Sequence, residues 1–331
     1  MNLTQAPVSA LVMLSGGLDS MLAACVLKEQ GIRVTGICFE SPFFTAHKAR
    51  VAAEQVGVPL LVENFTEDLI AIVEHPKHGF GSCINPCIDC HAAMIRRAGI
   101  ILKRDGFHFV ATGEVLNQRP MSQIRRNLDV VAEDSGLRDR LVRPLCARML
   151  PETEPERRGW VDRSRLLALN GRGRKPQYKL AEQYGIKQYP PSDSGCKLTE
   201  PHYAERLWDL RRNRQLQDLR AITLLRYGRH FRLSPRVKAV IGRNATENEM
   251  LGVSAQPGDT LLNMAPAIPG PTGLITGSAG ELEILMAARL CARFSDVRTA
   301  PTVTLLITGP SGHREVDVAP ATDLDLERLK I

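Results

Sequence analysis

A short run of small and polar residues near the start of the chain has the composition of an anion-binding loop. It comprises Ser15, Gly16, Gly17, Asp19 and Ser20. The glycines remove Cβ atoms that would block a phosphate, and the hydroxyls and backbone N–H groups at a helix start donate to an anion. An acid in such a loop repels phosphate unless a divalent cation lies between them. The loop therefore predicts a site for Mg²⁺ and a nucleotide pyrophosphate.

The loop differs from the two commonest nucleotide-binding motifs. It lacks the Lys-Ser/Thr ending of the P-loop NTPases and the G-x-G-x-x-G of dinucleotide folds. It resembles the SGGxDS signature of the PP-loop ATP pyrophosphatases, which adenylate a substrate oxygen and release pyrophosphate. The resemblance implies an ATP site in a Rossmann-like parallel sheet of the adenine nucleotide α-hydrolase type. The simpler alternative is a turn that caps a helix, with Asp19 as an ordinary acid of the first turn.

Three later segments extend the resemblance. Residues 112–123, beginning Thr112-Gly113-Glu114, resemble the TGE-x-LGQ-x-x-SQ segment of the tRNA 4-thiouridine synthases, and residues 142–145 resemble their RPL turn. Residues 85–91 are similar to the NP-x-x-x-C-N loop of the tRNA 2-thiouridylases that modify position 34. Both families adenylate a uridine oxygen and replace it with sulfur. Because two of the three segments follow the first pattern, position 8 of tRNA is favoured.

The chain also departs from both patterns. Cys87 stands where the 2-thiouridylases have aspartate. We recognise neither the N-terminal RNA-binding module of the 4-thiouridine synthases nor a rhodanese-like domain with a persulfide cysteine. We therefore expect free sulfide or a sulfur donor protein to supply the sulfur by a different route.

Eight cysteines in a protein that we expect in the cytoplasm indicate thiol chemistry or metal binding, because disulfides are rare there. Four occupy apolar or helical contexts that predict burial, namely Cys25, Cys38, Cys146 and Cys291. The other four are Cys83, Cys87, Cys90 and Cys196.

Cys87 and Cys90 are expected at a helix start, where the helix dipole lowers the pKa of a thiol. Cys196 corresponds to the second catalytic cysteine of the thiouridylase families. Resemblance to the iron-sulfur branch of these enzymes implies that the three thiolates hold a [4Fe-4S] cluster with its fourth iron open. A persulfide route in which Cys196 closes a disulfide stays open, as does a zinc site completed by Cys83 or His91. Cys83 also gives the Cys-x-x-x-Cys-x-x-Cys spacing of radical SAM enzymes, and its replacing Cys196 as third ligand stays open.

Helical and strand patterns alternate through the first part of the chain. Helices are predicted over 18–30, 48–55, 67–74, 90–104 and from 180, and strands over 11–14, 33–40, 59–63 and 107–114. One helix between two strands gives a right-handed crossover, so the sheet is predicted to be parallel and doubly wound. Ligands of such sheets bind at the carboxyl ends of the strands, so we expect Phe39, Thr112 and Gly113 near the nucleotide. For Phe39 a role as a core aromatic is an equal alternative.

The composition shifts near residue 200. We therefore predict a PP-loop domain over 1–200 and a smaller α+β domain over 201–331. Residues 219–226 and 228–233 have strand-like or mixed patterns. Residues 238–248 weakly resemble the G-R-N-x-x-x-N turn of the NFACT-type RNA-binding domain, which implies that the second domain binds RNA.

The net charge of +7 fits a partner that carries many phosphates. The basic turn over residues 171–175 lacks acids to pair with and is predicted to contact RNA phosphates. In the second domain we expect the same of Arg211, Arg212 and Arg243.

Together these patterns predict an ATP-dependent tRNA uridine sulfurtransferase that uses Mg²⁺ and a [4Fe-4S] cluster. The alternatives are a PP-loop ligase or sulfurtransferase acting on a small molecule, and an RNA-binding protein with a decayed nucleotide site. We find no membrane-length apolar run and no signal segment, so we expect a cytoplasmic protein without a membrane partner. Self-association as a homodimer stays open.

Overall fold

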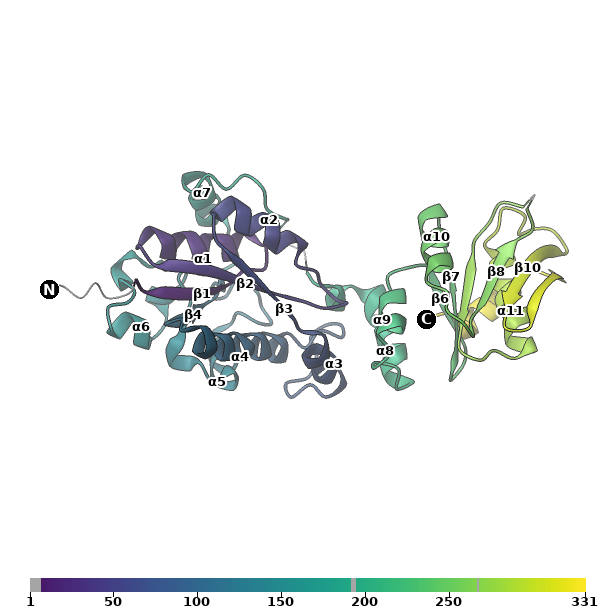
Figure 1. Ribbon diagram of the computed structural model, residues 1–331, viewed down its shortest axis with the longest axis horizontal. Helices are drawn as coiled ribbons and strands as arrows, with labels where there is room; N and C mark the ends of the chain where they lie inside the picture. The colour runs from purple at the N-terminus through teal and green to yellow at the C-terminus, as the bar shows by residue number, and fades with distance from the viewer. Residues whose placement is uncertain (1–6, 192–194, 267) are drawn as a thin grey trace. The chain divides into compact units, whose positions relative to one another are not determined.

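The structure, a computed structural model, describes residues 7–191, 195–266 and 268–331. The chain forms two compact units, residues 1–200 and 201–331 (Figure 1). Within the described residues, no helix is long and apolar enough to cross a membrane.

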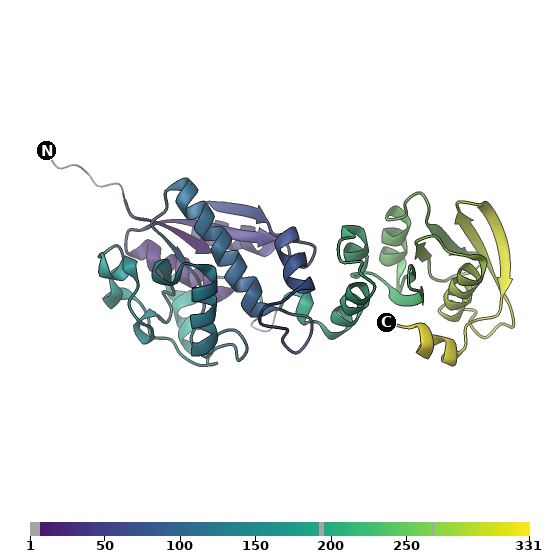
Figure 2. The ribbon, with the colours of Figure 1, turned by 90° about the horizontal axis from the view of Figure 1, so that it is seen from below.

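The first unit is built on a five-stranded parallel sheet in the order β3-β2-β1-β4-β5. Its strands are β1 (Ser9–Met13), β2 (Arg33–Glu40), β3 (Leu60–Asn64), β4 (Phe109–Ala111) and β5 (Leu141–Val142). One face carries α1 (Leu18–Glu29), α2 (His47–Val56) and α7 (Lys175–Gln183) (Figure 1). The other face carries α3 (Thr66–Glu74), α4 (Cys87–Asp105) and α5 (Arg125–Ser135), and Figure 2 looks onto this face. A short helix, α6 (Glu154–Arg157), lies between β5 and α7 in the chain. The predicted doubly wound α/β fold is confirmed.

Burial on both faces explains the sequence of the central strand. Ala10, Leu11 and Val12 of β1 are fully buried, as expected for a parallel strand covered by helices on each side. The helix α1 that follows is buried along most of its length, at Leu18 and from Ser20 to Leu27. The loop between β1 and α1 is thereby held between two rigid elements at the carboxyl edge of the sheet.

Several predicted boundaries are wrong. Helix α4 begins at Cys87 instead of Cys90, so Cys87 belongs to the first helical turn. Helix α7 begins at Lys175 instead of residue 180, and the strand predicted to end at Glu114 ends at Ala111. In the second unit, the strand-like stretch after residue 218 contains helix α9 (Leu219–Leu224), because the Asp218 side chain caps it by accepting from the Ala221 N–H.

A buried ion pair joins the ends of β4 and β5. Arg143 donates through Nε to Glu114 Oε2 at 2.8 Å, and each side chain is 7% exposed. The same oxygen accepts from Thr112 Oγ1 at 3.0 Å, and Arg143 Nη2 donates to the Leu128 carbonyl of α5 at 3.0 Å. Burial raises the pKa of Glu114, but the charge of Arg143 and the hydrogen bond from His91 outweigh it and lower the pKa to about 2.

The second unit is a six-stranded antiparallel sheet in the order β11-β10-β8-β9-β7-β6. Its strands are β6 (Arg229–Ser234), β7 (Val237–Ile241), β8 (Thr260–Met264), β9 (Gly273–Thr276), β10 (Val303–Gly309) and β11 (Gly312–Val318). Alternate residues of β7 face two separate cores. Val237, Ala239 and Ile241 pack with α11 (Glu281–Arg293), whereas Val240 packs with Leu224 of α9 and Leu251 of α10 (Ala245–Val253). Helices α8 (Pro201–Arg212) and α12 (Asp323–Leu329) begin and end this unit.

We predict that Glu114→Gln destabilises the first unit by about 3–5 kcal/mol at pH 7, because it leaves Arg143 buried without its counter-charge. The folded-state pKa of Glu114 lies below its unfolded value of about 4.3, so its contribution is present above pH 4.3 and is lost as the pH falls toward 2. The difference between wild type and variant should therefore shrink over that range. Urea unfolding followed by Trp160 fluorescence, in a Trp208→Phe background, measures it.

The matched control is Glu133→Gln, which breaks an exposed pair with Arg138. We expect it to change stability by less than about 1 kcal/mol. Equal stability of Glu114→Gln and wild type at pH 7 would contradict the role given to the buried pair.

Candidate active site

The phosphate loop follows β1 and leads directly into α1. Gly16 has φ of +85°, and a Cβ there would lie 2.5 Å from the carbonyl carbon of Lys48, so the loop packs directly on α2. Ser20 Oγ donates to the Gly17 carbonyl at 2.7 Å, and Ser15 is exposed. The N-cap residue Gly17 offers no side-chain oxygen to α1. The first N–H groups of α1 are thus available to an anion.

The turn after β4 packs against the same loop. A Cβ on Gly113 would lie 2.5 Å from the Ser20 backbone nitrogen and 2.6 Å from the Asp19 carbonyl, so only glycine fits between them. Thr112, one residue earlier, is buried and donates to Glu114. The structure therefore brings Thr112 and Gly113 beside the predicted nucleotide loop.

Asp19 lies in a polar network built from distant parts of the chain. Its Oδ2 accepts from Gln118 Nε2 at 2.6 Å and from Arg174 Nη2 at 2.7 Å. Gln177 Nε2 donates to Gln118 Oε1 at 2.7 Å and so fixes the amide that faces Asp19. Burial raises the pKa of Asp19, and the charge of Arg174 opposes that rise.

The other carboxylate oxygen of Asp19 fits a metal ligand. Oδ1 is buried and has no hydrogen-bond partner among the described residues. An orphaned buried carboxylate oxygen is costly unless a cation or ligand group satisfies it. The residues present therefore fit Mg²⁺ at Asp19, with phosphate oxygens completing the coordination of a hard cation.

Three of the predicted cysteines come together. Cys87 and Cys90 lie in the first turn of α4, and Cys196 approaches from a segment more than 100 residues later. Burial raises the pKa of Cys90 well above its usual range, and the nearby Cys196 and Cys87 raise it further. Burial likewise raises the pKa of Cys196, and Cys87 adds to that rise. The prediction that the helix start lowers thiol pKa is wrong for Cys90, because desolvation dominates.

Cys87 and Cys196 both raise the pKa of Cys90, and metal ligation, which deprotonates each thiol, would remove that repulsion. Cys87, Cys90 and Cys196 are each partly buried, which suits an iron-sulfur cluster with one open face. Among the described residues, the set of three side chains with ligand atoms within 4.8 Å of one another is His78, Asp89 and Asp134, which contains no cysteine. The three cysteines supply the number of thiols that a [4Fe-4S] cluster with one open iron takes, whereas a structural zinc site would need a fourth ligand.

Cys83 and Asn85 organise the loop before α4. Asn85 is buried, accepts from the Cys83 N–H at 3.1 Å and donates to Cys87 Sγ at 3.2 Å. Cys83 Sγ donates to the Thr199 carbonyl at 3.5 Å, and Thr199 Oγ1 donates to the Cys196 carbonyl at 2.7 Å. Cys83 thus lies against the segment that carries Cys196.

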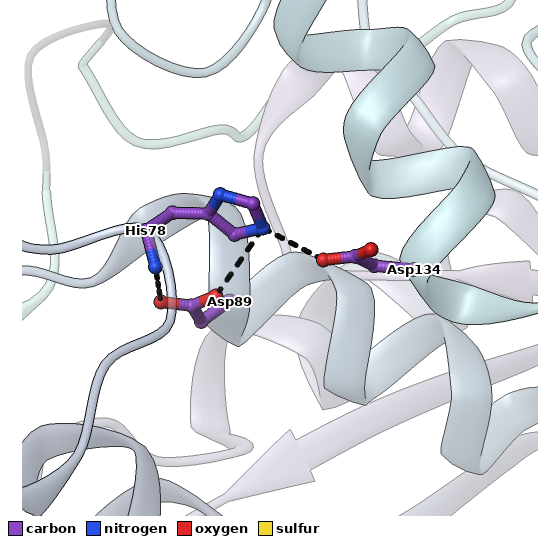
Figure 3. Close-up of side chains that lie close together, drawn as sticks. All are labelled: His78, Asp89 and Asp134. Carbon is purple, nitrogen blue, oxygen red and sulfur yellow. Dashed lines mark hydrogen bonds and ion pairs between the residues drawn. The ribbon is translucent and has the colours of Figure 1, made fainter.

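The side chains of His78, Asp89 and Asp134 lie close together and attach the loop before α4 to helices α4 and α5 (Figure 3). The His78 N–H donates to Asp89 Oδ2 at 3.0 Å, and its ring Nε2 lies 2.7 Å from Asp134 Oδ2. Lys77 donates to both oxygens of Asp134, at 2.8 and 2.9 Å. Because Lys77 already pairs with Asp134, we interpret these three residues as a structural link between the loop and helices α4 and α5.

The cysteines and the phosphate loop are connected indirectly, through residues next to each of them in the chain. His91, adjacent to Cys90 in α4, places Nδ1 3.2 Å from Glu114 Oε1. Glu114 follows Gly113, which packs on Asp19. The predicted thiol site and the predicted nucleotide loop therefore lie at the same edge of the sheet.

Other predicted residues occupy different environments. Phe39 is 4% exposed and meets the Phe65 ring edge to face, with centroids 5.4 Å apart. This position fits the core alternative, and we assign Phe39 no nucleotide contact. Arg174, predicted within an exposed basic turn, is 14% exposed and turned toward Asp19. Gln118, the other donor to Asp19, lies within the TGE-like segment, so the resemblance could have identified it. No sequence pattern pointed to the contact of Arg174 with Asp19.

The G-R-N-x-x-x-N turn of the second unit uses its polar residues locally. Asn244 caps α10 by accepting from the Glu247 N–H at 3.0 Å. Glu247 accepts from the Arg243 N–H at 2.9 Å and pairs with its guanidinium. Asn248 Oδ1 accepts from the Thr272 N–H at 3.0 Å. Arg243 is thus held by Glu247, and an RNA phosphate would compete with that pair.

Comparisons with known proteins match the two units separately. Residues 5–148 match the family described as thiamine biosynthesis protein (ThiI), and residues 228–329 match the NFACT protein RNA binding domain. The tRNA-specific 2-thiouridylase MnmA of Roseiflexus sp. (strain RS-1) is 32% identical over 146 residues, which cover 38% of each chain. The MnmA of Geobacter metallireducens is 35% identical over 102 residues, covering 24% of this chain and 28% of the relative. The chain thus spans well under half the length of the curated relatives it matches.

Among solved structures, a 4-thiouridine synthetase in complex with RNA and ATP is similar with 22% identity and a TM-score of 0.38. The match covers 65% of this chain and 52% of that one. The two family matches fall on the two units that the fold defines. Residues 5–148 are thus similar to the ThiI family, and residues 228–329 are similar to the NFACT RNA binding domain.

Proposed function

We propose that this protein is an ATP-dependent tRNA uridine sulfurtransferase. The observation that carries the proposal is the shared sheet edge, where the Asp19 loop and the thiols of Cys87, Cys90 and Cys196 are linked through the contact between His91 and Glu114. Activation of an oxygen and delivery of sulfur need two such sites next to each other. The ThiI match and the MnmA relatives support the same reaction class.

In the first step, the uridine carbonyl oxygen attacks the α-phosphorus of ATP and pyrophosphate leaves. The α1 N-terminus and Ser20 would bind phosphate oxygens, and Asp19 would hold Mg²⁺, which when bound would neutralise charge on the leaving pyrophosphate. In the second step, sulfide adds to the activated carbon, the carbon–oxygen bond breaks, and AMP leaves with the uridine oxygen. The sequence is redox-neutral when the donor is sulfide.

For sulfur delivery we propose Cys87, Cys90 and Cys196 as ligands of a [4Fe-4S] cluster. When bound, such a cluster supplies one open iron that can hold hydrosulfide. In the alternative persulfide route, Cys87 or Cys90 would carry the sulfur and Cys196 would close a disulfide on its release. Asn85 and Thr199 hold the two ligand segments in place.

For RNA binding we propose a surface of the first unit in addition to the NFACT-type domain. Tyr178 and Tyr189 are 47% and 38% exposed, and their rings stack with centroids 6.3 Å apart. Lys179 and Lys187 flank them and make no ion pair among the described residues. Gln55 fixes the second tyrosine's segment by donating to the carbonyl and accepting from the N–H of Gln188. Exposed aromatics with unpaired cations suit unstacked bases and their phosphates.

We propose O4 of the uridine at position 8 as the atom that is replaced, on the ThiI match and the TGE-like and RPL segments. Mass spectrometry of nucleosides from a deletion strain tests this choice, and we expect 4-thiouridine to disappear. Loss of 2-thiouridine with 4-thiouridine intact would assign position 34 instead.

The reaction itself is tested with labelled ATP, bulk tRNA and sulfide. We expect AMP to form only when both tRNA and sulfide are present, in step with sulfur incorporation. AMP formation that needs neither RNA nor sulfide would support a small-molecule enzyme. Binding of tRNA without any AMP would support an RNA-binding protein with a decayed nucleotide site.

We predict that Asp19→Asn lowers AMP formation about a hundredfold or more, because it removes the charge that holds the metal on the pyrophosphate. Binding of tRNA should stay near wild type. Asp68→Asn, a change of the same kind on α3, should leave turnover intact. Near-normal thiolation by the Asp19 variant would overturn the magnesium assignment.

We predict that anaerobically purified protein contains about four irons per chain and is brown, and that alanine at Cys87, Cys90 or Cys196 removes the iron. Cys83→Ala and the core control Cys291→Ala should keep it. Iron analysis and visible absorption measure both. Colourless protein that stays active in air, with a trappable disulfide to Cys196, would support the persulfide route. Iron loss in Cys83→Ala but not in Cys196→Ala would mean that the ligand set is wrong.

We predict that Tyr178→Ala weakens tRNA binding by about 1–3 kcal/mol without changing its salt dependence, because stacking releases no counterions. Lys179→Gln should instead lower the slope of log K against log salt by about 0.7–0.9. Arg104→Gln, whose guanidinium pairs with Asp105, should change neither quantity. Wild-type affinity in the tyrosine variant, or an unchanged slope in the lysine variant, would remove this surface from the RNA interface.

A further inference from the structure

The contact between Arg174 and Asp19 joins residues 155 positions apart in the chain. Arg174 Nη2 lies 2.7 Å from Asp19 Oδ2, and each side chain is 14% exposed. The pair stands at the N-terminus of α1, where the phosphates of the proposed ATP substrate would bind. An ion pair so far from solvent requires desolvation of both charges, so stability alone is a weak reason for it.

The charges at this position conflict with the proposed chemistry of the nucleotide-free site. Asp19 is proposed to hold Mg²⁺, yet a guanidinium and the Gln118 amide already occupy its Oδ2. Only Oδ1 is without a partner among the described residues. A guanidinium and a divalent cation repel each other, so the Asp19 carboxylate cannot bind both of them strongly at the same time. Binding of Mg²⁺ and ATP therefore requires Arg174 to find another anion.

The local structure allows that exchange. Arg174 is the N-cap residue of α7 and follows a turn with Gly171 at φ of +86° and Gly173, where a Cβ at either glycine would meet nothing within 4 Å. The helix itself is anchored, because Gln177 is buried and bonded to Gln118, and α7 packs on α1. The backbone of α7 is thus anchored, while Arg174 at its start directly follows a glycine turn that is open to its surroundings.

We propose that Arg174 exchanges Asp19 for the pyrophosphate portion of ATP. In the free protein its guanidinium neutralises Asp19; in the complex Mg²⁺ takes the carboxylate and the guanidinium donates to β- and γ-phosphate oxygens. A planar guanidinium suits both anions, because it binds carboxylate and phosphate with paired N–H groups. It also neutralises the charge that develops on pyrophosphate as it leaves. This proposal rests on the proposed function and adds Arg174 to its catalytic residues.

Two binding measurements without RNA test the exchange. The first titrates Mn²⁺, as a spectroscopic substitute for Mg²⁺, into ATP-free protein and follows it by electron paramagnetic resonance. The second measures the affinity of a non-hydrolysable ATP analogue in the presence of Mg²⁺. The variants are Arg174→Gln, Arg174→Lys, Asp19→Asn and, as a matched control, Arg172→Gln, which changes an exposed arginine two residues away.

For Arg174→Gln we expect opposite shifts. Mn²⁺ should bind several-fold more tightly because Asp19 is freed, whereas the ATP analogue should bind about tenfold more weakly because a charge-assisted contact is lost. Arg174→Lys, which keeps the charge and the fold, should fall between wild type and Gln in both measurements. Asp19→Asn should abolish Mn²⁺ binding, so that the spectrum stays that of the free ion, and Arg172→Gln should match wild type in both.

Unchanged affinity for the ATP analogue in both Arg174 variants would overturn the proposal, since the guanidinium would then not reach the phosphates. Weaker Mn²⁺ binding in Arg174→Gln would also overturn it, because Arg174 would then support the metal instead of competing with it. Both readouts are independent of sulfur transfer. A wild-type protein that forms no AMP with tRNA and sulfide would refute the proposed function while leaving the exchange testable.

Discussion

A carboxylate at the bottom of a phosphate-binding loop must always have a positive partner. The N-terminus of α1, with the close packing that Gly16 and Gly113 allow, makes a site for anions. Asp19 puts a buried negative charge into this site. In the structure Arg174 and Gln118 meet that requirement. During the proposed reaction a magnesium ion meets it instead. The elements that surround the loop, from α2 to the distant start of α7, are arranged so that one partner can replace the other.

The two halves of the proposed reaction depend on a second buried charge. Glu114 is held by Arg143 and in turn faces His91, next to a proposed cluster ligand. The TGE-like and RPL segments therefore meet as one ion pair that fixes the ends of β4 and β5. Their pairing explains why both motifs occur in the same chain.

Local sequence patterns predicted the helices and strands whose side chains are buried along the whole element. The helix after the phosphate loop and the strand over 33–40 are found within a residue of their expected bounds, because continuous apolar burial defines them. The stretch over 219–226 was predicted as strand-like or mixed since the six residues of helix α9 are too few to show a helical period, although Asp218 caps the helix. The approach of Cys196 to Cys87 was inferred from resemblance alone. The raised pKa of Cys90 could not be predicted because burial depends on packing by distant segments. Arg174 was read as an RNA contact because charge in sequence does not reveal which anion it faces.

The central claim is that ATP activates the uridine oxygen itself. The most direct measurement uses tRNA carrying ¹⁸O at O4 of the target uridine, with ATP and sulfide, and follows the label by mass spectrometry. The mechanism predicts that each sulfur incorporated yields one AMP whose phosphate carries the ¹⁸O. Thiolation accompanied by AMP without the label would contradict it, because ATP would then be hydrolysed by water and the oxygen would leave by another path.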